Sequence, residues 1–205
     1  MFQGRETFPL YLQVTYDRRT IFFKSYYFEL FAQPKYAFLS TNILQVIDLE
    51  SGLLDILIDE NVERFTLEGL LQQYKRWSVD VLDSCDGSFK QLLAGVFRSE
   101  GLNGLAEMVV GAGDGVAGIR LWEEFGRSLS GGLFERMRER VIEEGHPYLP
   151  VAAYVWEKLP DGPMCLSLKE WKGKRKEIEQ YLGRASEFRG LDVGRVGEGI
   201  QRLLR

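Results

Sequence analysis

A glycine-rich segment near the middle of the chain is the strongest candidate for nucleotide chemistry. Residues 113–118 read Gly-Asp-Gly-Val-Ala-Gly and match the spacing Gly-x-Gly-x-x-Gly. In dinucleotide-binding folds these glycines allow a tight turn and let the backbone approach a pyrophosphate. That function also needs a second strand ending in an acid, which the sequence lacks, and Asp114 would repel a pyrophosphate. The segment 111–118 therefore favours an inter-helix loop, with nucleotide binding as an alternative.

Side chains that could catalyse a reaction are scarce. The single histidine, His146, stands before Pro147 at the expected end of a helix. A histidine there is more often a cation that interacts with the helix dipole than a general base. The chain contains no Gly-x-Ser-x-Gly elbow, no His-Glu-x-x-His pair and no phosphate loop ending in Gly-Lys-Ser/Thr. These absences predict a protein that is not an enzyme and that carries no cofactor.

The acidic stretch 80–87 resembles a calcium loop, but the residue at its first position would be Leu82, which cannot coordinate a hard cation. We expect its carboxylates to end one helix and begin the next. Cys85 and Cys165 have neither metal-ligand nor redox-motif spacing, which is typical of a reducing cytoplasm. No metal site is predicted, and the expected compartment is the cytoplasm.

Two groups of basic side chains could bind nucleic acid. Arg18 and Arg19 lie in a short polar turn between two apolar stretches, and Lys24 follows on the second stretch. A two-stranded ribbon of this kind fits the major groove of DNA, where arginines reach phosphates or guanine edges. The second group surrounds the start of a helix near Trp171 and could contact phosphates; it comprises Lys172, Lys174, Arg175 and Lys176.

The charge distribution limits any nucleic-acid surface to part of the chain. The net charge is −4, and residues 41–70 hold seven acidic side chains against one basic one. Residues 1–40 and 165–205 carry net charges of +2 and +4. A protein that bound duplex DNA along its whole length would be more basic. The chain contains no run of about 18 uncharged apolar residues, so no membrane span is predicted.

The elements that position the arginines read as β structure. Residues 9–16 alternate between apolar and polar side chains, and residues 20–28 are rich in β-branched and aromatic ones. With residues 17–19 as the turn, they predict an antiparallel hairpin. A third short strand is expected at residues 36–39.

The rest of the chain reads as helices, recognised by apolar stripes, capping residues and glycine stops. For residues 43–58 we favour a helix capped by Thr41 over a second hairpin that turns at residues 50–52. Thr66, Ser88 and Ser167 are expected to open further helices, and Gly145 to end one. The other predicted helices span residues 67–81, 88–97, 102–110, 119–129, 132–144, 171–182 and 193–204.

This order of strands followed by helices predicts an α+β fold. We expect residues 1–40 to form a small antiparallel sheet, as a hairpin or with three strands. Residues 41–205 are expected to form a helical domain that packs with the sheet as one compact unit.

The hairpin resembles a known DNA-binding family. Residues 8–16, a short polar turn and residues 21–26 are similar to the arm-type DNA-binding domain of phage-like integrases (tyrosine recombinases) of Bacteroidetes. The resemblance implies a small sheet that reads DNA, followed by helices, with Arg18, Arg19 and Lys24 as DNA contacts. The family's His-x-x-Arg motif is absent, since residues 146–149 read His-Pro-Tyr-Leu. The resemblance therefore implies a non-catalytic relative, associated with mobile elements.

Three functions remain as hypotheses. The most specific is a non-enzymatic protein that contacts duplex DNA through the basic-tipped hairpin. The first alternative is a protein-interaction or structural module that uses the sheet edge for a partner or for self-association, with Tyr26, Tyr27 and Phe28 as the contact patch. The second alternative is a nucleotide binder that uses Gly113, Gly115 and Gly118.

Overall fold

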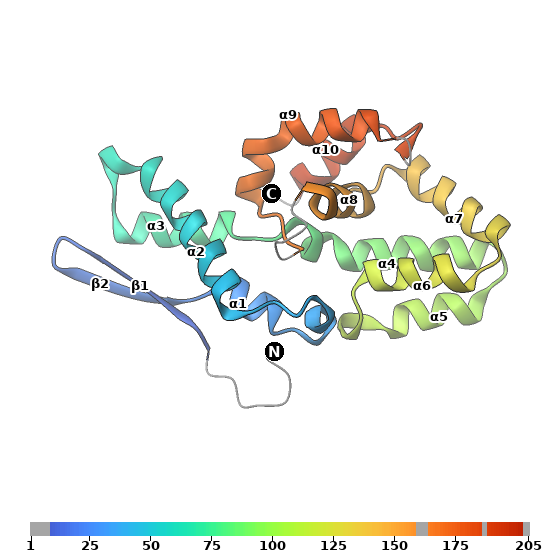
Figure 1. Cartoon of the computed structure of the whole chain (residues 1–205), viewed down its shortest axis with the longest axis horizontal. Helices are drawn as coiled ribbons and strands as arrows, with labels where there is room; N and C mark the ends of the chain where they lie inside the picture. Colours follow the sequence, from blue (N-terminus) through green and yellow to red (C-terminus); the bar gives the residue numbers. More distant parts are fainter. Residues whose placement is uncertain (1–8, 159–163, 186–187, 203–205) are drawn as a thin grey trace. The chain divides into compact units, whose positions relative to one another are not determined.

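The computed structural model describes residues 9–158, 164–185 and 188–202 (Figure 1). It confirms the α+β class, with one two-stranded hairpin followed by helices. The chain divides into two compact units, which we describe separately. Unit 1 comprises Met1–Val79 with Ser167–Lys169, and unit 2 comprises Asp80–Leu166 with Glu170–Arg205. The boundary expected at residue 40 falls inside unit 1, because the helix after it packs against the helices on either side.

Strands β1 (Tyr11–Tyr16) and β2 (Arg19–Lys24) form the predicted antiparallel hairpin, in which Tyr16 lies opposite Arg19 and Tyr11 opposite Lys24. The two turn residues, Asp17 and Arg18, have φ angles of 47° and 61°. Two consecutive left-handed residues give the turn whose twist matches that of paired strands.

The second strand is shorter than predicted, and the third strand does not form. Helix α1 (Tyr26–Phe31) begins directly after β2, because the Ser25 hydroxyl accepts the Phe28 N–H at 2.9 Å. The aromatic run that favoured a strand instead buries Tyr27 and Phe28 on a helix face. Residues Pro34–Leu39 form a 3-10 helix with the proline at its start, where its fixed φ angle suits a helical turn.

Unit 1 is completed by helices α2 (Ile43–Asp59) and α3 (Leu67–Trp77), with a short 3-10 turn between them. The helix favoured for residues 43–58 is confirmed, but its cap is Asn42 rather than Thr41. Asn42 and Gln45 form a reciprocal capping box that satisfies two N–H groups. Thr66 caps α3 as predicted, and α3 ends four residues earlier than expected.

The segment Ser167–Lys169 joins unit 1 through specific contacts. The Leu168 N–H donates to the Val79 carbonyl at 2.8 Å, and the Lys169 ammonium pairs with Glu60. That ammonium also lies 5.3 Å from the centre of the Trp77 ring. These contacts extend unit 1 to a part of the chain about ninety residues further on.

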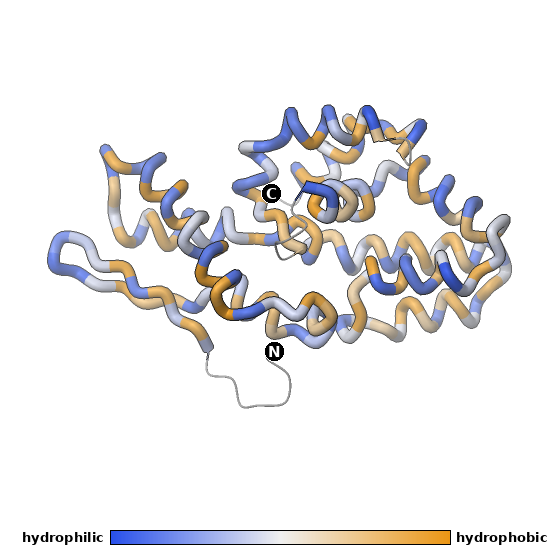
Figure 2. Tube along the Cα trace, in the orientation of Figure 1, coloured by the Kyte–Doolittle hydropathy of each residue, from blue (hydrophilic) through white to orange (hydrophobic). Residues whose placement is uncertain are grey.

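Unit 2 is helical among its described residues. Its helices are α4 (Val81–Ser99), α5 (Asn103–Gly111), α6 (Gly118–Ser128), α7 (Gly131–Glu144), α8 (Tyr148–Lys158), α9 (Leu168–Arg184, whose first two residues fall in unit 1) and α10 (Val193–Arg202). α4 packs against α5, α6, α7 and α8. Its fully buried Phe89, Leu93 and Phe97 form the centre of the core, and Figure 2 shows the apolar stretches along α4.

Two helices of unit 2 differ from the prediction. α4 begins at Val81 because the Asp80 carboxylate accepts the Asp83 N–H at 2.6 Å, so Ser88 lies inside the helix and donates to the Cys85 carbonyl. α8 was not predicted. Most of its side chains are buried, so it lacks the polar face that makes a surface helix visible in sequence.

The remaining helix ends follow the predictions closely. Gly145 ends α7 with a φ angle of 63°, as a left-handed cap. α10 is described as far as Arg202, so the end predicted for this helix at residue 204 lies outside the described residues. No helix in the described part of the chain is both long and apolar enough to cross a membrane.

Candidate functional site

The hairpin presents one face to solvent. Its outward side chains form the opposed pairs Tyr11–Lys24, Gln13–Phe22 and Thr15–Thr20, all exposed. Neither strand contains an acidic residue. Arg18 and Arg19 are exposed at the turn, which is the end of the hairpin away from α1 in Figure 1. Three predicted DNA contacts, Arg18, Arg19 and Lys24, therefore all lie in solvent on one hairpin.

The opposite face anchors the hairpin within unit 1. Phe23 is buried, and its ring centre lies 4.7 Å from that of Tyr74 on α3. Tyr16 lies equally close to Phe65, in an edge-to-face arrangement. Near the turn, Arg19 approaches Glu68 to 4.0 Å, with both side chains exposed. An exposed pair at this distance adds little stability, so the Arg19 guanidinium can exchange Glu68 for a phosphate.

Of the three aromatic residues expected as a contact patch, Tyr27 and Phe28 are buried and Tyr26 is half-buried. Tyr27 and Phe28 are 1% and 6% exposed because α1 turns them into the core. The exposed aromatic side chains of the described hairpin are instead Tyr11, Tyr16 and Phe22, at 54%, 50% and 63%. The sequence pattern indicates the outward position of residues 11 and 22, since they alternate with inward-facing apolar residues along the strands.

A buried carboxylate ties the base of the hairpin to the helices of unit 1. Glu50 on α2 is 1% exposed and accepts hydrogen bonds from the Ser25 hydroxyl, the Tyr74 hydroxyl and the Tyr27 N–H. The Tyr74 oxygen in turn accepts the Tyr26 N–H at 2.7 Å. Burial raises the pKa of Glu50, although these hydrogen bonds partly oppose that shift.

The second basic group lies on α9, in unit 2, and part of it is engaged. Lys174 pairs with Glu170 at 3.8 Å, and Arg175 pairs with Glu179 at 2.7 Å. Lys172 and Lys176 are exposed. Trp171 is 2% exposed, so its ring belongs to the core and is not available for stacking on a base.

The glycine-rich segment connects α5 to α6 through a 3-10 turn at Gly113–Gly115. Both of its ends are bonded to α4: the Lys90 ammonium donates to the Gly113 carbonyl at 2.6 Å, and the Gly118 N–H donates to Asp86 at 2.7 Å. A side chain at position 118 would lie 2.8 Å from the Phe89 ring. Close packing against α4 therefore explains Gly118 without a nucleotide.

Asp86 is the centre of a second buried network. Its carboxylate forms an ion pair with Lys90 at 2.5 Å and accepts a hydrogen bond from the Tyr148 hydroxyl at 3.0 Å. The Tyr148 oxygen accepts the Ile119 N–H at 3.1 Å. The expectation that the acids of residues 80–87 separate two helices holds for Asp80, which caps α4, and is wrong for Asp86, which lies within α4 and points inward.

The environment of His146 excludes the role expected from its position. Nδ1 accepts the Tyr148 N–H, so the proton is on Nε2, which lies 3.0 Å from the Ser88 hydroxyl. That hydroxyl donates to a carbonyl on α4, so the pair is not arranged as a nucleophile and its base. Burial lowers the pKa of His146 to about 4. The residue is neutral at pH 7 and cannot act as a cation at the end of α7.

Asp80 and the cysteines have structural roles. Besides capping α4, the Asp80 carboxylate accepts the Leu166 N–H at 2.7 Å, and burial raises its pKa to about 6. Cys85 is buried, which raises its pKa to about 12, so its thiol is unreactive. Among the described residues, no three metal-binding side chains lie close enough together to hold an ion.

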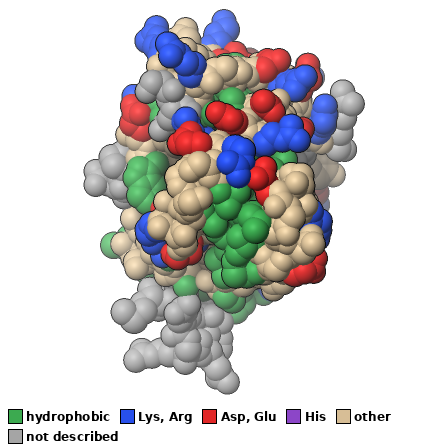
Figure 3. Space-filling model, turned by 90° about the vertical axis from the view of Figure 1, so that its right-hand side faces the viewer, with side chains coloured by type: hydrophobic (Ala, Val, Ile, Leu, Met, Phe, Trp, Pro, Cys, Tyr) green, Lys and Arg blue, Asp and Glu red, His purple; other side chains and the backbone are tan. Residues whose placement is uncertain are grey.

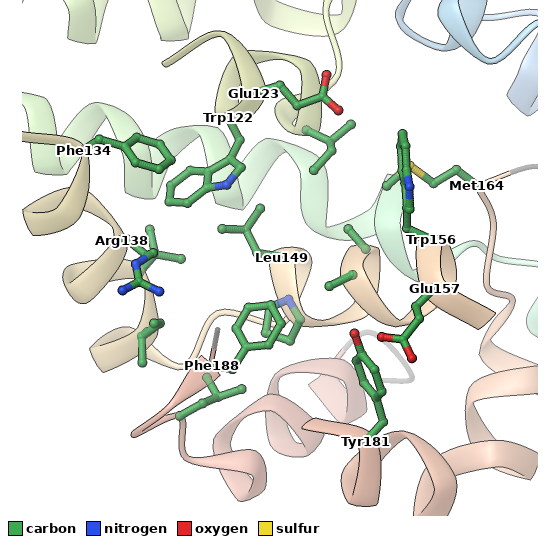
Figure 4. Close-up of a pocket in the computed structure, with 17 residues that line it drawn as sticks. Trp122, Glu123, Phe134, Arg138, Leu149, Trp156, Glu157, Met164, Tyr181 and Phe188 are labelled. Carbon is green, nitrogen blue, oxygen red and sulfur yellow. The ribbon is translucent and has the colours of Figure 1, made fainter. Parts of the chain in front are cut away.

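A hollow in unit 2 was not predicted from the sequence. It has a volume of about 430 Å³ and lies between α6, α7, α8, α9 and residues 188–191 (Figure 4). Its aromatic lining residues are Trp122, Phe134, Trp156, Tyr181 and Phe188. These residues come from five separate segments of the chain, and no regular spacing in the sequence indicates that they lie together. The face of the molecule in Figure 3 shows acidic and basic side chains around a hydrophobic area.

Comparison with known proteins yields no match among protein-family models, curated proteins or solved structures.

Proposed function

We propose that this protein binds DNA without catalysing a reaction, through the tip and outer face of the β1–β2 hairpin. The observation that carries the proposal is the exposure of Arg18, Arg19 and Lys24 on a ribbon whose strands contain no acidic residue. The net charge of the chain is −4, so this local cationic surface runs against the overall composition. The resemblance of the hairpin to integrase arm-type domains supports the same function.

A two-stranded ribbon held against the helices of unit 1 suits this function. A two-stranded ribbon fits the major groove, and arginines at its turn reach phosphates or guanine edges. The contacts of Phe23 with Tyr74 and of Tyr16 with Phe65 hold the ribbon in one orientation within unit 1. On α9, Lys172 and Lys176 are exposed and Lys174 and Arg175 lie in ion pairs at the surface; these four cations would add phosphate contacts.

The test is fluorescence anisotropy of a labelled DNA duplex at about 50 and about 200 mM salt. We expect binding that weakens steeply with salt, and a salt slope that falls by about 2 in an Arg18→Ala/Arg19→Ala variant, since each phosphate contact contributes about 0.9. The matched control is Arg127→Ala/Arg140→Ala, which removes the same charge from exposed sites in unit 2. An equal loss of DNA affinity in both variants would show that binding depends on total charge and not on the hairpin. The absence of binding at low salt would refute the proposal.

One observation favours a second function, association with a protein partner or with another copy of the chain. Tyr11 and Phe22 are more than half exposed on the outer face, and exposed aromatic side chains are enriched at interfaces. A Tyr11→Ser/Phe22→Ser variant that lost self-association in light scattering but kept DNA affinity would assign the face to protein contacts. Nucleotide binding by the glycine segment is the weaker alternative, since the Gly118 N–H already donates to Asp86.

A further inference from the structure

The hollow in unit 2 is lined by aromatic side chains that remain in partial contact with solvent. Five aromatic side chains line it, and all five are incompletely buried, with Trp156 exposed to 58%. In Figure 4, Trp122 and Phe134 lie on one side, Trp156 and Tyr181 on another, and Leu149 between them. The Trp122 and Phe134 rings are 4.8 Å apart, in contact with each other. Concave sites lined mainly by apolar and aromatic side chains are typical places for small-molecule binding.

The charged residues at the hollow are already satisfied. Each of the three lies in an ion pair with a neighbour: Glu123 with Arg120 at 2.7 Å, Arg138 with Glu135 at 2.9 Å, and Glu157 with Lys158 at 3.0 Å. Hydrogen bonds from Lys158 and from the Tyr181 hydroxyl hold the pKa of Glu157 below its usual value. A charged ligand would gain a counter-ion there only by displacing one of these partners, each at 3.0 Å or less, and would lose part of its own hydration.

We propose that this hollow binds a neutral, flat aromatic compound between the rings of Trp122, Phe134, Trp156 and Tyr181. The volume of about 430 Å³ lies within the range of small-molecule sites, which are mostly apolar with a few polar groups. The ring faces supply stacking and edge-to-face contacts, which favour a flat aromatic over an aliphatic chain of equal size. The paired charges select a neutral compound over an ion.

The site is independent of the hairpin and of the DNA proposal. All of its lining residues belong to unit 2, whereas the hairpin belongs to unit 1. Variants in the hollow can therefore be compared with variants in the hairpin, and the failure of one proposal leaves the other intact.

The experiment measures binding of N-phenyl-1-naphthylamine, a neutral aromatic dye that becomes fluorescent in apolar sites, to the full chain. Ala153 lines the hollow, and an Ala153→Trp substitution should fill it and abolish binding. Trp156→Ala removes one exposed ring and should weaken binding by about 3- to 10-fold. Phe22→Ala, which removes an equally exposed ring from the hairpin, is the matched control and should bind normally. Circular dichroism and the melting temperature establish that each variant is folded.

Two further measurements decide the chemistry of the ligand. An anilinonaphthalene sulfonate and a naphthyl trimethylammonium salt should each bind more than about 10-fold more weakly than the neutral dye, because their charges stay unpaired. An equal or higher affinity of either ion would overturn the proposal, and so would unchanged dye binding by Trp156→Ala. A dimer in light scattering that the dye dissociates would assign the hollow to a second copy of the chain instead.

Discussion

The two buried carboxylates of this protein, Glu50 in unit 1 and Asp86 in unit 2, have nearly the same surroundings. Each is 1% exposed. Each accepts a backbone N–H from the first turn of a helix, α1 or α6, and a hydroxyl from a tyrosine, Tyr74 or Tyr148. In both, the tyrosine oxygen accepts a neighbouring N–H of the same helix. A carboxylate and a tyrosine together thus satisfy two N–H groups at a buried helix start.

The two networks differ in charge. Asp86 has the Lys90 ammonium beside it, whereas the further partner of Glu50 is the Ser25 hydroxyl, and no cation is paired with Glu50 in the described part of the chain. Burial accordingly raises the pKa of Glu50. The comparison shows that the same helix-start arrangement can be built with or without an ion pair, and that the two versions should respond differently to mutation and to pH.

The largest effect is expected from removing the cation. Lys90→Met leaves the Asp86 charge buried without a counter-ion, and breaking such a pair costs about 3–5 kcal/mol of unfolding free energy. Lys90→Met/Asp86→Asn removes both charges and should recover most of that loss. Denaturant unfolding measures both values. If the double variant is no more stable than the single one, the ion pair is not what distinguishes the Asp86 network.

His146 in unit 2 and Glu50 in unit 1 should contribute to stability in opposite directions as the pH falls. Burial lowers the pKa of His146 to about 4, so the unfolded chain binds that proton more tightly. The contribution of His146 to the stability of unit 2 is therefore fully present above pH about 6.5, and up to about 3 kcal/mol of it is lost as the pH falls through 4. Glu50 has a raised pKa, so the folded form binds its proton more tightly. Unit 1 is favoured below pH 4.5 and loses stability as the pH rises through the folded pKa.

Denaturant unfolding followed by residue-resolved NMR at pH 4, 5, 6 and 7 separates the two units. Asp80 in unit 2 opposes His146 over much of this range, because its pKa is raised to about 6 and its contribution to stability is lost as the pH rises through that value. His146→Gln should therefore leave in unit 2 the loss of stability with rising pH that Asp80 causes, and Glu50→Gln should remove the pH dependence that Glu50 gives unit 1. A pH profile of unit 2 that His146→Gln leaves unchanged would contradict the comparison.

The tyrosine hydroxyls test how much each carboxylate depends on neutral partners. Tyr74→Phe should cost about 2–3 kcal/mol, because the hydroxyl contacts both oxygens of Glu50 and that carboxylate has no cation beside it. Tyr148→Phe should cost about 1 kcal/mol, since Lys90 and the Gly118 N–H still hold Asp86. The two variants delete the same atom, so thermal unfolding compares them directly. The reverse order would refute the role given to Lys90.

The smallest effect is expected at the serines. Ser25→Ala removes the cap of α1 and one hydrogen bond to Glu50, and should cost about 1–2 kcal/mol. Ser88→Ala, within α4, loses bonds to a carbonyl and to His146 and should cost less than about 1 kcal/mol. Chemical denaturation gives both differences, and an equal cost would show that the cap of α1 contributes little.

Most helices could be predicted because their signals are local. Thr66 and Gly145 act within one helical turn, and apolar stripes mark the buried face of a surface helix. The prediction of secondary structure was wrong where the local sequence suited both a strand and a helix. The aromatic run after Lys24 suits a strand, but the Ser25 cap and the buried Glu50 beneath it select a helix. α8 is buried on nearly all sides and therefore has no stripe to detect.

One candidate site could be predicted from local sequence and the other could not. The exposed cations of the hairpin follow from the alternation of two short strands and from a turn of two residues. The hollow in unit 2 could not be predicted in this manner, since its aromatic rings come from five separate segments of the chain. The position of His146 after a helix suggested a cation, and only its burial among other side chains shows that it is neutral at pH 7.

The hairpin, its basic tip, most of the helices and their order along the chain could be predicted from the sequence, because each depends on residues a few positions apart. Which polar groups share a buried site follows instead from packing between distant segments. Asp86 meets Tyr148 across 62 residues, and Glu50 meets Ser25 across 25. Burial forces each such group to find a partner, and the partner is chosen by packing rather than by distance along the chain.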